Sequence, residues 1–416
     1  MNACYDALET RDPAAREAAL LAALPGHVAQ AQIHSPAFAE ILAGVDARTV
    51  TSRAALAALP VTRKHELLAR QQAQRAESVF GGFAAIGFGA AMPRVFASPG
   101  PIYEPEGTAR DYWRLARAMF AAGFRPGELI HNSFSYHFVP AGSMMETGAH
   151  ALGCTVFPAG TGQTEQQVQA MAELRPAGYI GTPSFLKIIV EKAAELGVAL
   201  PSVTKALFGG EAFPPSLRDW FLARGIDGYQ CFATADLGLI AYETPAREGL
   251  LLDESVIVEI VRPGTGDPVP DGEVGELVVT PLNAAYPLVR FGTGDMSAIL
   301  PGCCPSGRTN SRIKGWMGRA DQTTKVRGMF VHPGQVHAIT RRFPEIVKAR
   351  LVVSGEMAND TMTLRIETHC TGPDSLVEKV GLAIREVTKL RGDVEVLLPG
   401  SLPNDGKVIE DARSYK

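Results

Sequence analysis

The stretch that decides the fold class is residues 179–197, which read YIGTPSFLKIIVEKAAELG. Residues 179–181 predict a short buried strand. Ser184 is placed to cap the helix that follows, and Gly197 ends that helix. A strand leading directly into a helix is the unit from which layered α/β domains are built.

The same alternation extends over the neighbouring sequence, from about residue 127 to 280. A capping box at residues 164–167 begins a helix, because its hydroxyl and amide side chains satisfy backbone N–H groups at the helix start. Residues 206–208 predict another strand, and residues 214–226 another helix. We therefore predict an α/β fold in several layers for the large N-terminal part.

The sequence pattern changes after Asp321. We expect an N-terminal domain over residues 1–320 and a small α+β C-terminal domain over residues 321–416. The expected elements of the second domain are strands at 347–353, 361–367 and 393–398 and a helix at 374–390.

Composition limits the class of protein. The chain has 416 residues, 46% of them hydrophobic and 20% charged, which is a globular composition too long for one ordinary core. The net charge of −4 gives no basic excess for nucleic acid or an anionic membrane. The six cysteines form no disulfide framework, and neither a signal peptide nor a membrane-spanning run is evident. We expect a soluble, cytoplasmic protein.

Five short segments could carry chemistry, although each alone resembles an ordinary turn. Glycines directly after a strand let a planar ligand approach the backbone. A carboxylate in a turn of small residues could bind Mg²⁺, and one after a Gly-Thr-Gly bend could accept ribose hydroxyls. The segments are FGGE at 208–211, FATADLG at 232–238, YPLVRFGTGD at 286–295, GRAD at 318–321 and PNDGK at 403–407.

In this order and spacing the segments resemble the core motifs of the AMP-forming, or adenylate-forming, ligase superfamily. Three further stretches narrow the resemblance to the phenylacetate-CoA ligase family. The resemblance implies a large multi-layer N-terminal domain and a small C-terminal lid hinged at Asp321. The three stretches are GTGQTEQQ at 160–167, GTPSF at 181–185 and PGCCPSGRT at 301–309.

Ligases of this kind join a carboxylate to ATP, which gives an acyl-adenylate and pyrophosphate, and a thiol then displaces AMP. The resemblance implies ATP, Mg²⁺ and CoA as cofactors and a small carboxylic acid, aromatic or similar, as substrate. It suggests a homodimer and implies no nucleic-acid or membrane partner.

The resemblance also implies roles for single residues. Lys407 would be the mobile lysine of adenylation, whose ammonium neutralises charge as the carboxylate attacks the α-phosphate. Asp236 would stand at the Mg²⁺ position, and Asp321 would be the hinge of a lid that excludes water. The nucleotide would be bound by Gly209, Gly210, Glu211, Phe232, Ala233, Asp295 and Arg319.

The acyl pocket is expected beside two segments, residues 135–138 and residues 182–185. Aromatic rings there would suit a flat, apolar acid, although an aromatic run belongs as often to a core as to a pocket. The expected pocket residues are Tyr136, His137, Phe138, Pro183 and Ser184.

The phosphate loop departs from the family pattern, which is rich in Ser, Thr and Gly and ends in Lys-Pro. Here residues 97–105 read ASPGPIYEP, so Glu104 stands where the lysine belongs. Pro99 and Pro101 remove N–H donors that a phosphate cradle uses. Either Glu104 faces the phosphates and repels ATP, or Pro101 and Pro105, which fix φ on its two sides, turn it outward.

Two metal positions depart as well. Family members usually have Glu after a hydroxyl residue where this chain has Asp236 after Ala235. Several carry a structural zinc built from Cys and His, and here only one of the four matching residues is a zinc ligand, so we expect no zinc. Those four residues are Thr244, Leu251, Cys304 and Ser306.

Three hypotheses remain. The first is an AMP-forming ligase that transfers an acyl group to CoA. The second is an adenylating enzyme that passes the acyl group to a carrier-protein thiol or an amine. The third is a non-catalytic or repurposed nucleotide- or CoA-binding homologue, which the altered phosphate loop favours. The retained residues Asp295, Arg319, Asp321 and Lys407 argue against it, because a mere binding protein has no need for the lid lysine.

Overall fold

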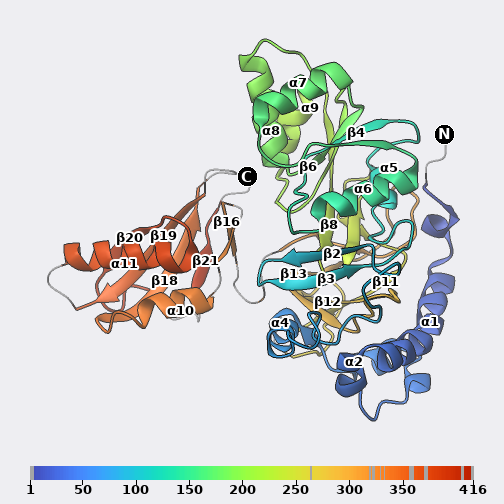
Figure 1. The fold of residues 1–416 in the computed structure, drawn as a ribbon, viewed down its shortest axis with the longest axis horizontal. Coiled ribbons are helices and arrows are strands. Elements are labelled where there is room, and N and C mark those ends of the chain that lie inside the picture. The colour runs from blue at the N-terminus through green and yellow to red at the C-terminus, as the bar shows by residue number, and fades with distance from the viewer. Residues whose placement is uncertain are drawn as a thin grey trace. The chain divides into compact units, whose positions relative to one another are not determined.

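The computed structural model describes residues 4–262, 265–317, 320, 324–327, 329–331, 333–355, 360–369, 373–403 and 407–413. Chain contacts divide it into two compact units, Met1–Met317 and Gly318–Lys416, which we describe separately (Figure 1). Residues 318–319 and 321–323 lie outside the described part. The boundary after residue 320 and the hinge at Asp321 therefore stay predictions.

The first unit contains a nine-stranded sheet in the order β14-β15-β10-β9-β8-β7-β6-β4-β5. The strands from β8 to β5 are parallel, and the others are antiparallel. The parallel strands are β4 (Leu129–Asn132), β5 (Thr155–Pro158), β6 (Gly178–Gly181), β7 (Lys205–Phe208) and β8 (Asp227–Thr234). The antiparallel strands are β9 (Gly238–Glu243), β10 (Leu250–Leu252), β14 (Ile299–Leu300) and β15 (Arg312–Ile313).

Helices connect the parallel strands, as the alternating sequence pattern predicts. The predicted strand at 179–181 lies within β6, and the helix after it is confirmed as α8. The connecting helices are α6 (Ala141–Leu152), α7 (Thr164–Leu174), α8 (Pro183–Glu195) and α9 (Pro215–Leu222), and α5 (Ala116–Ala121) precedes β4.

Two predicted helix caps are wrong. Thr182 rather than Ser184 is the N-cap residue of α8, because Pro183 suits the first helical position, where no N–H is needed. The N-cap of α7 is Gln163, which adopts a left-handed conformation and makes no side-chain cap. Thr164 therefore lies inside that helix and does not form a capping box.

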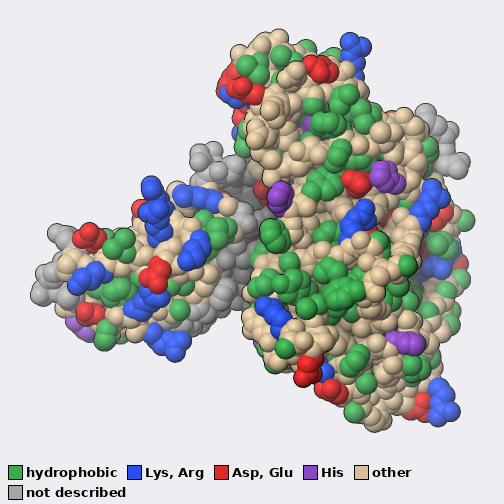
Figure 2. Space-filling model, viewed as in Figure 1, with side chains coloured by type: hydrophobic (Ala, Val, Ile, Leu, Met, Phe, Trp, Pro, Cys, Tyr) green, Lys and Arg blue, Asp and Glu red, His purple; other side chains and the backbone are tan. Residues whose placement is uncertain are grey.

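A second, four-stranded sheet has the order β1-β13-β12-β11, and a hairpin of β2 and β3 forms its own small sheet. Figure 2 shows hydrophobic side chains gathered over the part of this unit where Figure 1 draws β2 and β3. The strands are β1 (Thr62–Arg63), β2 (Arg94–Ser98), β3 (Ile102–Glu106), β11 (Val256–Val261), β12 (Gly275–Pro281) and β13 (Phe291–Ser297).

Helices near the N-terminus pack with this second sheet around one hydrophobic cluster, whereas α5 and α6 pack with the larger sheet around another. The first cluster joins Leu24 and Phe38 to Ile257 and Phe291, all with 0–1% of their surface exposed. The N-terminal helices are α1 (Pro13–His34), α2 (Pro36–Ile41), α3 (Arg53–Ala57) and α4 (Lys64–Ala73), with short 3₁₀ turns at Ala7–Thr10 and Ala47–Thr49.

The second unit has a four-stranded sheet in the order β20-β19-β18-β21, and its core is a separate cluster. The strands and the long helix expected there are confirmed. Leu376, Val380 and Ile384 recur every four residues and are buried, which explains why this helix covers a sheet. The elements are β16 (Thr324–Val326), β17 (Met329–Val331), α10 (Pro333–Thr340), β18 (Ile346–Ser354), β19 (Thr361–Thr368), α11 (Pro373–Thr388), β20 (Asp393–Leu397) and β21 (Ile409–Asp411).

The predicted fold class, an α/β N-terminal part followed by a smaller α+β unit, is confirmed. Among the described residues, no helix combines the length and the apolar character needed to cross a bilayer.

Candidate active site

Several predicted site segments leave the parallel sheet at the same edge. Residues 133–138 follow β4, residues 181–184 follow β6 and residues 209–211 follow β7, and these three strands are neighbours. The carboxyl ends of parallel strands meet at one edge of a sheet, where open α/β sheets bind their ligands. The topology therefore gathers segments far apart in the sequence.

The predicted adenine and acyl segments meet at one hydrogen bond. Ser184 in α8 donates from Oγ to Glu211 Oε2 over 2.5 Å. Gly209 is buried, and a Cβ there would lie 3.3 Å from Cys231 Sγ. Gly210 has φ +75°, which favours glycine. These two glycines thus let the chain turn tightly against β8 beside Glu211.

In the aromatic segment after β4, residues 136–138, one side chain is partly buried and two are exposed. The hydroxyl of Tyr136 accepts from Asn132 Nδ2 and donates to Glu146 Oε2, both over 2.8 Å. Burial, with the nearby Glu146 carboxylate, raises the pKa of Tyr136, so it stays a neutral donor. His137 is exposed, and Phe138 is 77% exposed. Of the three pocket residues predicted in this segment, Tyr136 has a side chain held by hydrogen bonds at the strand end, whereas the side chains of His137 and Phe138 are exposed.

Asp236 lies in the tight turn between β8 and β9, whose ends pair at Thr234 and Gly238. Its side chain is 1% exposed, and its Oδ2 is 2.7 Å from Lys64 Nζ. Its Oδ1 is buried and has no hydrogen-bond partner among the described residues. Phe232 and Ala233 precede this turn in β8 and are partly buried.

Glu104, in the altered hairpin, is turned inward and fully buried. It accepts from the Ser98 N–H over 3.2 Å and from the Ser98 hydroxyl. Burial and the charge of Asp236 raise the pKa of Glu104 to about 8, although Lys64 and the Ser98 bonds act in the other direction. Near neutral pH the Glu104 carboxyl is therefore mostly protonated. It points inward, but as a neutral group it repels the phosphates of ATP little.

Asp295 lies in β13 and is 8% exposed. Its N–H donates to Thr293 Oγ1, and its Oδ1 accepts from the indole Nε1 of Trp316, both over 3.0 Å. The indole thus orients the carboxylate predicted to bind ribose. Arg319 and Asp321 lie outside the described residues, and Lys407 is an exposed residue of the second unit, so their roles stay predictions.

The chain is similar to known proteins over most of its length. The phenylacetate-coenzyme A ligase of Thermus thermophilus is 32% identical over 343 residues, which cover 78% of this chain and 75% of that protein. The chain belongs to the phenylacetate-coenzyme A ligase family. The ligase of the same name from Aromatoleum evansii is 31% identical over 78% of this chain and 74% of its own. A family model described as AMP-binding enzyme matches residues 108–284.

A solved structure extends the likeness to nearly the whole fold. The 2-hydroxyisobutyryl-CoA ligase in complex with 2-HIB-AMP and CoA superposes with a TM-score of 0.81, at 24% identity, over 98% of this chain and 92% of that one. At this identity the match shows the fold. The predicted family and ligase fold are confirmed.

Three of the four positions matched to the family's zinc ligands, Thr244, Cys304 and Ser306, lie close together here. Cys304 Sγ lies 3.5 Å from Thr244 Oγ1 and 3.1 Å from Ser306 Oγ. Burial alone would raise the pKa of Cys304, but the hydrogen bonds of Ser306 and Thr244 outweigh it and lower that pKa. Hydroxyl partners thus stand where zinc ligands would be needed.

We expect purified protein to contain no stoichiometric zinc, because one thiol cannot build a structural site that needs four ligands. Elemental analysis of protein prepared with added zinc provides the measurement. About one zinc per chain would contradict the prediction.

The turn between β8 and β9 contains the residue expected to bind Mg²⁺, Asp236. Within the part of the chain that the structure describes, no group of three or more His, Cys, Asp or Glu residues could hold a metal ion. The buried, unbonded Oδ1 of Asp236 nevertheless fits the single carboxylate that Mg²⁺ often takes when substrate phosphates and water complete its shell.

Sequence reasoning missed the roles of three residues, Lys64, Trp316 and Gln167. Lys64 and Trp316 contact predicted site residues from outside every motif, and no local signal marks them. Gln167 belongs to the quoted GTGQTEQQ stretch, but its role appears only in three dimensions. It receives hydrogen bonds from Ser133 and His131 and donates to the carbonyls of Gly160 and Gly162, so it fastens this loop to β4.

Replacing Trp316 with phenylalanine should weaken the binding of both AMP and ATP about three- to tenfold, the effect of losing one orienting hydrogen bond. Calorimetric titration measures both affinities. Equal affinities in the variant and the wild type would show that the indole does not orient Asp295 for ribose.

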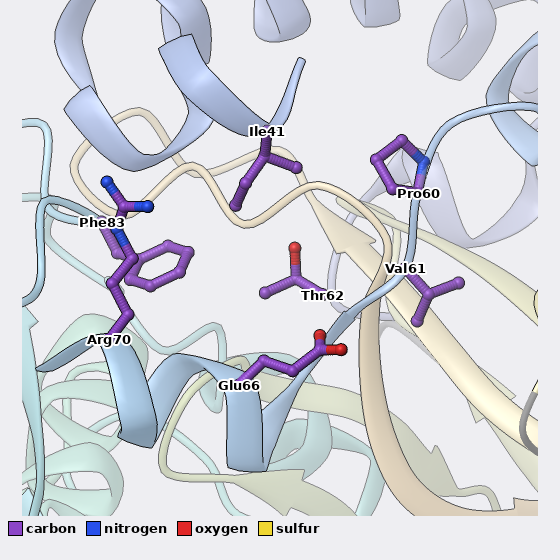
Figure 3. A pocket seen from close by; sticks show the side chains of 7 residues that line it. All are labelled: Ile41, Pro60, Val61, Thr62, Glu66, Arg70 and Phe83. Carbon is purple, nitrogen blue, oxygen red and sulfur yellow. The ribbon is translucent and has the colours of Figure 1, made fainter. Parts of the chain in front are cut away.

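A cavity of about 370 Å³ lies elsewhere, beside α2 and α4 (Figure 3). Its polar lining residues are Thr62, Glu66 and Arg70. Glu66 accepts from the Arg63 N–H, and Arg70 Nη1 lies 2.8 Å from Glu40 Oε2. Because both charged groups are paired within the protein, we do not place the reaction there.

Proposed function

We propose that this chain is an AMP-forming acid–CoA ligase that activates an aromatic or similar carboxylic acid with ATP. The observation that carries the proposal is the gathering of the motif segments around the ends of β4, β6, β7 and β8 in a chain of this family. Relatives named phenylacetate-coenzyme A ligases support the aromatic acid as the first substrate to test.

In the first step, an oxygen of the substrate carboxylate attacks the α-phosphorus of ATP. The bond to the bridging oxygen breaks, and pyrophosphate leaves. The turn at Gly209 and Gly210 would receive the adenine, and Asp295, oriented by Trp316, would accept the ribose hydroxyls. Asp236 would hold a Mg²⁺ ion that neutralises phosphate charge.

Lys407 and Arg319 would add positive charge from the second unit when it closes about Asp321. Preorganised charge of this kind is worth most in a site that excludes water.

In the second step, the thiol sulfur of CoA attacks the carbonyl carbon of the acyl-adenylate. The carbon–oxygen bond to phosphate breaks, AMP leaves with the electron pair, and the thiol proton passes to solvent. Tyr136, held by Asn132 and Glu146, and the segment of Pro183 and Ser184 would line the acyl side.

The altered hairpin supports the non-catalytic hypothesis less than its sequence alone suggests. A buried and largely protonated Glu104 brings little negative charge close to ATP. The acyl acceptor is either CoA or another nucleophile, such as a carrier-protein thiol or an amine. The experiment below distinguishes these acceptors. We further propose that the protein is a homodimer, as the family resemblance suggests. We also propose a reducing cytoplasm as its location, which suits the free thiols of the described cysteines.

The test is ATP–pyrophosphate exchange with a panel of aromatic and short-chain acids, followed by addition of CoA. We expect acid-dependent exchange and then a thioester. Exchange without thioester formation would favour another acceptor. No exchange with any acid, in protein shown to be folded, would favour the binding-protein hypothesis.

A further inference from the structure

The cavity beside α2 and α4 has no part in the proposed reaction, and most of its described lining residues are apolar (Figure 3). Its volume is about 370 Å³. Pockets that bind small molecules typically measure about 300–1,000 Å³ and combine apolar walls with a few polar groups. We propose that this cavity is a separate binding site for a small, uncharged, mainly apolar molecule that carries a hydroxyl group. The inference goes beyond the proposed ligase function and does not depend on it.

The protein itself holds the aromatic wall of the cavity in place. Phe83 is 1% exposed and packs edge-on against Phe38, with 5.6 Å between the ring centroids. The loop before Phe83 is fastened to α2, because the Ala37 N–H donates to the Gly82 carbonyl over 3.1 Å. A ligand therefore enters a preformed space and does not have to order this wall. The other apolar lining residues are Ile41, Pro60 and Val61.

One polar group of the lining lacks a partner. Thr62 is 4% exposed, and its Oγ1 is buried with no hydrogen-bond partner among the described residues. Figure 3 shows this hydroxyl directed into the space below Ile41. Leaving a buried hydroxyl without a partner is unfavourable, so a ligand that supplies a hydrogen bond gains affinity. A hydroxyl on the ligand suits this position, because it can either donate to Thr62 or accept from it.

The charged side chains near the cavity do not favour an anion. Arg70 Nη1 lies 2.8 Å from Glu40 Oε2, and Arg70 Nε donates to the Gly81 carbonyl over 2.8 Å. Glu66 adds a second carboxylate, whose Oε2 accepts from the Arg63 N–H. Two carboxylates thus offset the guanidinium of Arg70, and an acid gains no net attraction here. An uncharged molecule fits these surroundings better.

The cavity is distinct from the candidate active site. Its described lining residues include none of the residues predicted to bind the nucleotide or the acyl group. Thr62 and Glu66 flank Lys64 in the sequence, but the Lys64 ammonium lies 2.7 Å from Asp236 Oδ2, on the side of the candidate site. A molecule in the cavity would therefore contact neither the predicted ATP site nor the predicted acyl pocket.

The experiment uses benzyl alcohol as the probe and two molecules with the same ring for comparison. Toluene lacks the hydroxyl, and benzoate is charged. NMR spectra of the full chain labelled at isoleucine methyl groups report binding at Ile41, a lining residue. We expect a saturable shift of this methyl resonance, with an affinity for benzyl alcohol about three- to tenfold higher than for toluene, the effect of one hydrogen bond. Benzoate should bind there about tenfold more weakly than benzyl alcohol, or less.

Two variants test whether the molecule occupies the cavity. Thr62→Val keeps a similar shape without the hydroxyl, so it should bind benzyl alcohol and toluene equally. Its stability to urea should not fall, because the hydroxyl that it loses has no partner. Ile41→Trp should fill the space and abolish binding, measured by NMR of the ligand. Ile33→Trp is the matched control, because Ile33 is 74% exposed in α1 and does not line the cavity, so this variant should bind as the wild type does.

Three results would overturn the inference. They are no saturable shift of the Ile41 methyl with benzyl alcohol, unchanged binding by Ile41→Trp, and tighter binding of benzoate than of benzyl alcohol at this methyl. If Ile41→Trp does not fold, Thr62→Val still decides, because a retained preference for benzyl alcohol over toluene would show that Thr62 does not bind the hydroxyl. The titrations contain no ATP, so a failure of ATP–pyrophosphate exchange counts against the proposed function alone.

Discussion

Replacing Lys407 with alanine should slow adenylate formation about 10²–10³-fold, since removing one preorganised charge contact typically costs this much. Lys407 lies just before β21 in the second unit and is exposed there, so its truncation should leave the core of that unit intact. Thioester formation from a supplied acyl-adenylate should be affected far less, because no charge then builds on the α-phosphate. Single-turnover assays of the two half-reactions give the comparison.

Lys379→Ala is the matched control for Lys407. Lys379 is an exposed lysine of the same unit, in α11, where alanine is a good helix former. It should leave both half-reactions unchanged. An equal loss of both half-reactions in Lys407→Ala would show that Lys407 supports the structure of the second unit and does not act in adenylation.

Local sequence signals predicted many of the helices and strands correctly, and several predicted site segments follow neighbouring strands. The strand before Gly181 and the glycines after Phe208 are defined by residues within a few positions of each other, so periodicity and turn chemistry are enough to find them. Neighbouring parallel strands then bring these turns to one sheet edge. This part of the site follows from local pattern and a general rule of sheet topology.

The contacts that orient the site could not be predicted in this way. Lys64 and Asp236 are separated by 172 positions, and Asp295 and Trp316 by 21. Neither Lys64 nor Trp316 has a neighbour in the sequence that distinguishes it from an ordinary surface residue. The pairing of β1 with β13 and the turn between β8 and β9 bring Lys64 close to Asp236. Backbone hydrogen bonds from Lys314 to Ala298 and from Met317 to Met296 hold Trp316 beside Asp295.

The direction of Glu104 was undetermined for a similar reason. In a β-hairpin, the side chains of alternate residues face opposite sides, and which side is buried depends on what packs against it. Prolines at 101 and 105 fix backbone angles on the two sides of Glu104 but do not choose the buried face. Packing of the hairpin beside α4 and the Asp236 turn directs Glu104 inward, against Ser98.

The inward position of Glu104 predicts a stability that depends on pH. Burial, followed by the charge of Asp236, raises the folded-state pKa of Glu104 from 4.5 to about 8. Between these values the folded protein retains a proton that the unfolded chain has released, so stability falls as pH rises. The stabilisation from the protonated form is full below about pH 4.5 and is lost as pH passes through about 8.

Glu104→Gln should remove this dependence, because the amide has nearly the same shape and stays neutral. We expect the variant to be more stable than the wild type above pH 8, by an amount on the order of a few kcal/mol, and to follow a flatter stability curve. Urea unfolding from pH 6 to pH 9 provides the measurement. Parallel curves for the two proteins would show that Glu104 is ionised in the folded protein throughout this range.

The same ionisation should appear in nucleotide binding. As Glu104 loses its proton, a carboxylate forms beside Asp236 and the phosphate side of the site, so wild-type affinity for ATP should fall about tenfold between pH 7 and pH 9. Glu104→Gln should keep its affinity for ATP over that range.

Glu104→Lys should be destabilised and should not improve ATP binding, because it places a second ammonium in a fully buried position close to Lys64. Tighter ATP binding by a stably folded Glu104→Lys would mean that this side chain faces the phosphates as a charge, and the buried, protonated state would then be wrong.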